Sequence, residues 1–326
     1  MGLYTALARP LVFRLPAEAS HGLAENVLRV SPAWALAGAI LRSNHPGLKV
    51  EIAGMNLPNP VGMAAGFDKN CRVIGSLLSL GFGFAVGGTV TLHPRPGNAR
   101  PRMFRDQRRR ALVNALGFPG SGLARAQARL AKLPTSQSRR AWVSVSGSEE
   151  QDILECHRTL EPLVSAVEVN ISSPNTAGLR VFQEPGRLRS LIKSITERKK
   201  RPLFVKMPRF DGAGADRKLL ELGTVAIEAG AEGLVVANTL PVEDPRLAVG
   251  RGGLSGEPLF DSTLRFVESL RSGLPAHATL IACGGVTTAR DVRRLMSAGA
   301  AGVQLYTAFV YEGVGLPGKI CRQLSR

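Results

Sequence analysis

The sequence has 326 residues, of which 44% are hydrophobic and 21% charged, and this balance excludes a disordered or collagen-like chain. Its 42 Lys+Arg against 25 Asp+Glu give a formal charge of +17, which is typical of proteins that meet nucleic acid or an anionic membrane. Four cysteines without paired spacing exclude the common zinc and iron–sulfur signatures, so we expect no metal site and a reducing compartment.

Residues 1–45 are predicted to be helical, because apolar residues recur at helical spacing from Leu23 to Val30 and a second apolar helix opens at Pro32. Two interpretations remain open for this segment. It forms either a cap packed on the main domain or a hairpin that lies in a membrane surface with Trp34 in lipid. No stretch of the sequence reaches the ~20 apolar residues of a transmembrane helix, and secretion is not expected.

From residue 50 onward, short apolar runs alternate with helical patterns, which indicates β/α units and a parallel sheet. Eight such units predict an α/β fold, a (β/α)8 TIM barrel over residues 46–326 with 1–45 as a small N-terminal helical extension. A doubly wound sheet is the weaker alternative, since it usually has fewer strands and a Gly-rich first turn. The predicted strands are 59–64, 82–88, 141–146, 166–171, 203–207, 233–237, 279–283 and 302–306. The predicted helices include 72–80, 119–132, 187–199, 215–229, 258–272, 287–298 and one from about residue 309.

The active site of such a barrel lies at the C-terminal ends of the strands. Amides, hydroxyls, glycines and two lysines follow the strands here, whereas histidines and carboxylate pairs are nearly absent. These groups suit a planar hydrogen-bonding ring and an anion rather than a metal. The residues are Ala65, Gly66, Lys69, Thr89, Asn114, Ser144, Asn170, Lys206, Asn238, Thr239, Gly284, Gly285, Tyr306 and Thr307.

Three features of this rim have specific interpretations. Gly284 and Gly285 precede a predicted helix after the seventh strand, which is the usual phosphate site of the fold, although a Gly-Gly pair alone can be a tight turn. Lys206 ends an apolar strand and should be partly buried against an anion, such as the charge at N1/C2=O of a flavin, or in a salt bridge to a neighbouring strand. Gly66 beside Lys69 suggests that the backbone approaches a ligand closely.

Eight motifs make the sequence resemble the dihydroorotate dehydrogenases, and the quinone-dependent, membrane-associated class 2 in particular. Residues 13–28 (FRLPAEASHGLAENVL) also resemble the helical extension of that class, which the soluble class lacks. The motifs are GMAAGFDKN (62–70), FGFAVGGTVT (82–91), PRPGNARPRMFR (94–105), VNALGF (113–118), VNISSPNTAGLR (169–180), GGLSGEPL (252–259), CGGV (283–286) and VQLYTAF (303–309).

The resemblance implies an FMN-containing barrel that oxidises dihydroorotate to orotate in pyrimidine biosynthesis and passes electrons to a membrane quinone. The N-terminal helices would form a lipid-facing quinone tunnel, and the protein would lie peripherally on the cytoplasmic face of a bacterial inner membrane. By the same resemblance, Ser173 is the catalytic base, Lys69, Asn114, Asn170, Asn175, Asn238 and Thr239 bind the substrate, and His21 and Arg105 line the quinone site. The implied FMN contacts are Ala65, Gly66, Thr89, Asn114, Ser144, Asn170, Lys206, Ser255, Gly256, Gly284, Gly285, Tyr306 and Thr307.

In the mechanism that this resemblance implies, Ser173 takes the C5 proton of dihydroorotate while the C6 hydride goes to N5 of FMN. A serine hydroxyl is a poor base at neutral pH, so it needs a relay and a dry site, and Thr176 and Phe118 resemble the family's residues in that role.

The sequence also departs from the family pattern at supporting positions. Ser144 replaces a usual asparagine, and other departures are Ala115, Pro119, Gly147-Ser148-Glu149, Met207-Pro208-Arg209 for Ala-Pro-Asp, Ala237 and Leu240. One alternative is therefore a divergent paralogue that acts weakly or on another ring acid. A distant alternative is an RNA-binding flavoprotein of the dihydrouridine synthase type, but Ser173 stands where that type needs a cysteine, so we expect no nucleic-acid partner.

Most of the excess charge lies between residues 95 and 140, which contain twelve Lys+Arg and one acid, Asp106. The resemblance places Arg105 at the quinone entrance. We therefore expect Arg108, Arg109 and Arg110 to face an anionic membrane surface, with a merely solvated arginine-rich face as the alternative.

Overall fold

The computed structural model describes residues 4–43, 45–172 and 179–326. Ser173 and Asn175, predicted as base and substrate ligand, lie outside the described residues, as does Thr176.

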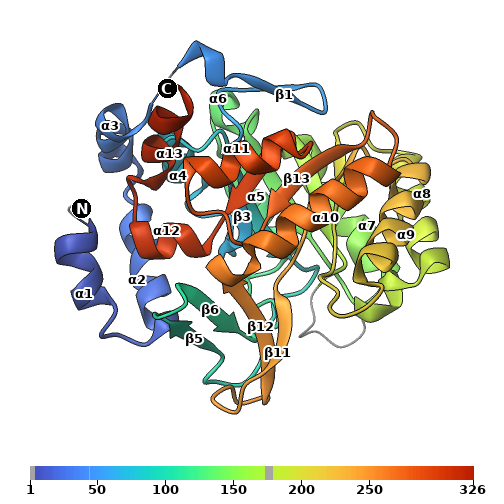
Figure 1. Cartoon of the computed structure of the whole chain (residues 1–326), viewed down its shortest axis with the longest axis horizontal. Coiled ribbons are helices and arrows are strands. Elements are labelled where there is room, and N and C mark those ends of the chain that lie inside the picture. The colour runs from blue at the N-terminus through green and yellow to red at the C-terminus, as the bar shows by residue number, and fades with distance from the viewer. Residues whose placement is uncertain (1–3, 44, 173–178) are drawn as a thin grey trace.

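Eight parallel strands close into a barrel, which confirms the predicted fold class (Figure 1). They follow one another around the barrel in sequence order, and each begins and ends within a few residues of its predicted run. The strands are β3 (Val61–Asp68), β4 (Phe84–Val90), β7 (Ala141–Val145), β8 (Ala166–Asn170), β9 (Leu203–Lys206), β10 (Gly233–Val236), β13 (Thr279–Cys283) and β14 (Gly302–Leu305). Most of their residues are buried, which explains their continuous apolar pattern.

Helices surround the barrel, and all but the short α6 bury apolar residues (Figure 1). They are α4 (Ile74–Ser79), α5 (Leu123–Leu130), α6 (Thr135–Ser138), α7 (Glu150–Leu160), α8 (Pro185–Thr196), α9 (Ala215–Glu228), α10 (Phe260–Gly273), α11 (Ala289–Ser297), α12 (Thr307–Glu312) and α13 (Leu316–Leu324). Short 3₁₀ turns occur at Pro46–Leu48, Glu161–Leu163, Leu179–Gln183 and Glu257–Leu259.

Large side chains fill the barrel at the end away from the polar rim. Trp142 stacks between Phe84 and Phe204, with ring centroids 4.4 and 4.6 Å apart. Ile52 and Leu57 of a hairpin, β1 (Val50–Ile52) and β2 (Met55–Leu57), pack into the same cluster. The sequence did not predict this hairpin, because three-residue strands are too short to show a period. It closes the N-terminal end of the barrel strands, so ligands reach the barrel from the opposite rim (Figure 1).

A second, antiparallel sheet of four strands lies at the C-terminal ends of the barrel strands and was also not predicted (Figure 1). Its order is β11 (Leu240–Glu243), β12 (Arg251–Gly256), β6 (Ala111–Asn114) and β5 (Met103–Asp106). The two hairpins come from the loops after β4 and β10, which are distant in sequence, and pair through β6 and β12. This sheet, called the rim sheet below, covers the C-terminal end of the barrel.

The N-terminal segment forms a π-helical turn (Tyr4–Ala8) and the helices α1 (Arg9–Val12), α2 (Ala17–Leu28) and α3 (Ser31–Leu41). Glu18 of α2 forms an ion pair of 2.6 Å with the buried Arg102. Helix α3 packs so closely on α4 that a Cβ at Gly38 would lie 2.1 Å from the carbonyl oxygen of Ser79. The segment is therefore a helical extension docked on the barrel.

Candidate functional site

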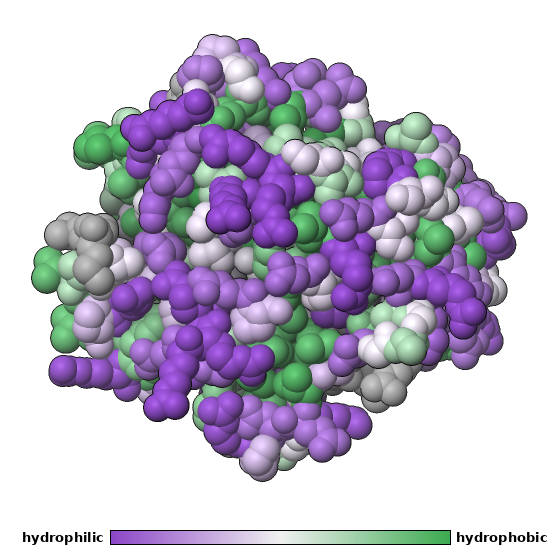
Figure 2. Space-filling model, in the orientation of Figure 1, coloured by the Kyte–Doolittle hydropathy of each residue, from purple (hydrophilic) through white to green (hydrophobic). Residues whose placement is uncertain are grey.

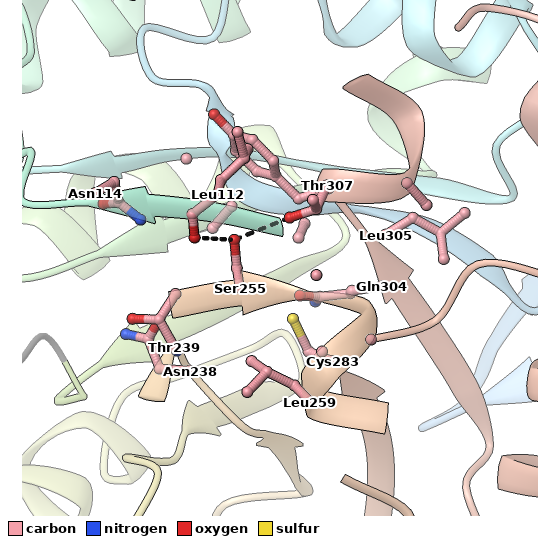
Figure 3. A pocket seen from close by; sticks show the side chains of 18 of the residues that line it. Leu112, Asn114, Asn238, Thr239, Ser255, Leu259, Cys283, Gln304, Leu305 and Thr307 are labelled. Atoms are coloured by element: carbon pink, nitrogen blue, oxygen red, sulfur yellow. Dashed lines mark hydrogen bonds between the residues drawn. The ribbon is translucent and has the colours of Figure 1, made fainter. Parts of the chain in front are cut away.

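One cavity of about 1280 Å³, which includes its solvent-open mouth, lies between the C-terminal ends of the barrel strands and the rim sheet (Figure 3). Most of the predicted site residues line it: Ala65, Gly66, Lys69, Thr89, Asn114, Asn170, Lys206, Asn238, Thr239, Ser255, Gly256, Gly284, Gly285, Tyr306 and Thr307.

A glycine turn and two hydroxyls form the end of the cavity next to α11. Gly284 and Gly285 have φ values of 124° and 78°, and a Cβ at Gly285 would lie 2.3 Å from the backbone nitrogen of Phe260. Only glycine fits such a turn. Ser255 and Thr307 face each other with their hydroxyl oxygens 2.9 Å apart (Figure 3). A turn without side chains at the entry to a helix, beside two hydroxyls, is suited to bind a phosphate.

Lys206 lies in the wall of the cavity and pairs with Glu168 of the neighbouring strand β8. The Nζ atom lies 3.7 Å from Glu168 Oε1, and both side chains are buried. Gln304 of β14 donates a hydrogen bond of 3.2 Å to the other carboxylate oxygen. Burial lowers the pKa of Lys206, but the Glu168 carboxylate outweighs it and holds the pKa above its ordinary value. The structure thus contains the predicted salt bridge to a neighbouring strand and also presents the lysine to the cavity.

Amides and hydroxyls form a continuous hydrogen-bond network at the other end. Asn170 donates to Thr89 Oγ1 at 3.1 Å, and Ser172 donates to Asn170 Oδ1 at 2.6 Å. Asn238 donates to Ser172 Oγ at 2.8 Å. Ser144 lies behind this network, with its hydroxyl 3.0 Å from Thr89 Oγ1, and does not line the cavity. These hydrogen bonds hold the two asparagines in fixed orientations. Ser144 contacts the network through its hydrogen bond with Thr89.

Lys69 is partly buried and contacts the N-terminal helix α2, because its Nζ lies 2.7 Å from Nε2 of His21. Burial and the lysine charge lower the pKa of His21 to about 3, so its imidazole is neutral and accepts from Lys69. Burial lowers the pKa of Lys69 to about 8. His21, which the sequence assigned to the quinone site, thus orients a lysine that lines the cavity.

Two arginines of the rim sheet are held by neighbours rather than pointing outward. Arg105 lies 4.5 Å above the Phe13 ring and donates to the Leu15 carbonyl and the Ser20 hydroxyl, which joins β5 to the N-terminal segment. Arg110 pairs with Glu257 and Glu312 at 2.5 and 2.6 Å. Arg110 therefore has two carboxylate partners within the chain, and its contact with a membrane stays a prediction.

The apolar roof of the cavity, the wall formed by side chains of the rim sheet and its neighbours, could not be predicted from the sequence. Its side chains come from the rim sheet and the segments next to it: Met103, Leu112, Leu116, Leu259 and Tyr311. The short apolar run Ala111, Leu112 and Val113 was the only available signal, and three residues are too few to distinguish a strand from a loop.

Within the described ranges, no group of three or more His, Cys, Asp or Glu side chains could hold a metal ion. The fold and cavity define a (β/α)8-barrel protein with a rim cavity that combines a glycine turn, two lysines and a set of amides and hydroxyls.

The family model for dihydroorotate dehydrogenase matches residues 47–326, and the chain belongs to this family. A protein of Chelativorans sp. (strain BNC1) named dihydroorotate dehydrogenase (quinone) is 37% identical over 344 residues, which cover 100% of this chain and 92% of that protein. A protein of the same name from Novosphingobium aromaticivorans is 36% identical, and the match covers 98% of this chain and 94% of that protein. The crystal structure of DHODH in complex with ferulenol from Eimeria tenella superimposes with a TM-score of 0.84 at 28% identity, and the match covers 96% of this chain and 93% of that one.

Proposed function

We propose that the protein oxidises (S)-dihydroorotate to orotate with FMN as cofactor and a membrane quinone as electron acceptor, as a step of pyrimidine biosynthesis. The observation that carries this proposal is that one cavity joins a phosphate-suited glycine turn and a buried lysine to a second lysine and a set of fixed asparagines. The names of the relatives, dihydroorotate dehydrogenase (quinone), support the same activity.

The residues of the cavity fit FMN. Gly284 and Gly285 leave room for the phosphate, and Lys206 places a positive charge in the wall for the ring. Gln304 Oε1 and Tyr306 Oη are buried without a hydrogen-bond partner among the described residues, which indicates that a polar ligand completes the site. When bound, FMN supplies the acceptor for a hydride from the substrate.

The chain's own residues bind and orient the substrate. Lys69 holds the carboxylate, while Asn114, Asn170 and Asn238 recognise the amides and carbonyls of the ring. Ser173 accepts the C5 proton. The apolar roof keeps water away, which helps a weak serine base.

A two-stage absorbance experiment tests the function. The purified protein should carry a yellow flavin that bleaches when dihydroorotate is added without oxygen and recovers when a ubiquinone or menaquinone analogue follows. Bound flavin that stays oxidised would exclude dihydroorotate as substrate and favour the divergent paralogue. A protein that binds no FMN would exclude the flavoprotein assignment altogether.

Substrate binding should depend on the protonation of Lys69. The pKa of about 8 means that Lys69 loses its positive charge as the pH rises through 8, while His21 stays neutral throughout. We expect kcat/KM for dihydroorotate to fall above pH 8 in the unaltered protein. Lys69→Met should lack this limb and raise KM about 10–100-fold, the value of a charge-assisted hydrogen bond. Lys319→Met, at an exposed site, is the control. A profile that stays flat to pH 10 would contradict this role for Lys69.

We propose further that residues 1–45 form a membrane-association segment on an FMN-binding barrel of residues 46–326, with the protein on the cytoplasmic face of a bacterial inner membrane. Among the described helices, none is long and apolar enough to cross a membrane. Helices α1 to α3 nevertheless expose large apolar side chains, including Leu11, Leu36 and Ile40, at 63%, 75% and 80%. Figure 2 shows apolar groups at the left edge, where Figure 1 places α1 and α3.

This surface predicts a specific loss of vesicle binding. Leu36→Ser combined with Ile40→Ser should weaken sedimentation with vesicles about tenfold or more per residue, because each side chain loses its burial in lipid. Val249→Ser, at an exposed apolar residue of the loop between β11 and β12, is the matched control. Unchanged binding of the double variant would rule out this face as the docking surface. Arg108 and Arg109 are exposed, so binding should also increase with anionic lipid content and decrease with salt.

A further inference from the structure

Arg209, three residues after β9, is a buried cation without a carboxylate partner among the described residues. It is only 4% exposed. Its guanidinium donates to the Asn238 carbonyl at 2.8 Å, to the Ser262 and Thr263 hydroxyls at 2.7 and 2.8 Å, and to the Cys283 carbonyl at 3.4 Å. All of these acceptors are neutral.

In the part of the chain that the structure describes, no carboxylate lies within ion-pair distance of this guanidinium. No ion pair of Arg209 with a carboxylate occurs among the described residues, and the residues outside them, 1–3, 44 and 173–178, contain no Asp or Glu. Burial lowers the pKa of Arg209 to about 10, so it still carries its charge at neutral pH. Because a buried charge without a counter-ion is strongly unfavourable, a compensating anion is expected nearby.

The guanidinium lies directly behind the glycine turn of the cavity. A Cβ at Gly284 would lie 2.7 Å from Arg209 Nη2, and the Cys283 carbonyl next to it accepts from the same nitrogen. Gly284 lines the cavity, whereas Arg209 does not. A phosphate held at this turn would therefore be separated from the positive charge only by the backbone of the turn.

We propose that Arg209 is the buried counter-charge of the cofactor phosphate. It acts as a positioning residue, since it holds the backbone of Cys283 and stabilises the dianion through the low-dielectric interior. Its bond to the Asn238 carbonyl also joins the phosphate turn to a substrate asparagine. The proposal rests on the proposed function for the identity of the ligand. It assigns to binding a residue that stands where the family pattern has an aspartate.

Two variants distinguish a role of the Arg209 charge from a role of its hydrogen bonds alone. Arg209→Lys keeps the charge and loses the fork of hydrogen bonds, whereas Arg209→Met loses both. If the charge matters, Arg209→Met should raise the Kd of the apoprotein for FMN about tenfold or more, and Arg209→Lys should change it by no more than about threefold. Ser262→Ala, which removes one acceptor of Arg209 and no charge, is the matched control and should bind FMN normally.

Fluorescence titration of the apoprotein with FMN and with riboflavin measures these effects. Riboflavin lacks the phosphate, so its affinity should differ little between Arg209→Lys and Arg209→Met. Equal losses of FMN affinity in both variants, or no loss in Arg209→Met, would overturn the proposal. If Arg209→Met does not fold, Arg209→Gln removes the charge and keeps a donor. An unaltered protein that does not bind FMN would instead refute the proposed function.

Discussion

Replacing Ser173 with alanine is expected to leave flavin bound and to slow its bleaching by dihydroorotate about 10²–10⁴-fold, the contribution of a general base. Ser173 follows Ser172, the residue through which Asn170 and Asn238 are joined at the end of β8. The family resemblance assigns Ser173 the C5 proton. Stopped-flow absorbance without oxygen isolates this half-reaction from quinone reduction, so the measured rate reports the proton and hydride transfers.

Ser172→Ala is the matched control for this prediction. The Ser172 hydroxyl bonds both asparagines of the network, and its loss should loosen their orientation. We therefore expect a raised apparent Kd for dihydroorotate with a much smaller effect on the limiting rate. If Ser173→Ala bleached at the rate of the unaltered protein, the base would be another group. If the Ser172 variant lost the limiting rate instead, the two serines would have been assigned in the wrong order.

The barrel could be predicted from the sequence because burial leaves a simple pattern there. Trp142 and Val143 point to opposite sides of β7, and both are fully buried, so the strand has no polar face to obscure it. The rim sheet could not be predicted, because its strands are only four to six residues long. Gly253 and Asn114 meet across β12 and β6 from loops distant in sequence, and no local pattern encodes such a pairing.

The site was predictable to the extent that it consists of residues at strand ends. Asn170 and Lys206 could be placed at the rim because each ends a buried run. Their partners could not be foreseen. Glu168 lies within the apolar run AVEVN, where only the tertiary structure shows that it meets Lys206, and His21 reaches Lys69 because α2 docks beside β3. Charge compensation in a barrel interior depends on which strands are neighbours, and this follows from closure of the sheet.

The Lys206–Glu168 pair should make the largest single contribution to stability within the site. Lys206→Met leaves the Glu168 carboxylate buried without a cation, and breaking such a pair costs about 3–5 kcal/mol of the free energy of unfolding. Lys206→Met combined with Glu168→Leu removes both charges and should recover most of this loss, because apolar replacements of a buried ion pair are often neutral or stabilising.

Urea unfolding of the FMN-free protein measures these free energies without a contribution from cofactor binding. Arg158→Met breaks the exposed pair with Glu155 on α7 and should leave the free energy of unfolding nearly unchanged, so it controls for loss of an ion pair as such. If the double variant were as unstable as Lys206→Met alone, the lost packing of the lysine rather than the unpaired Glu168 charge would be the cause. A lower free energy of unfolding for Lys206→Met that recovers in the double variant would support the pairing of the two charges. Glu168 would then be the group that stabilises a charged lysine at the cavity wall before any anion binds.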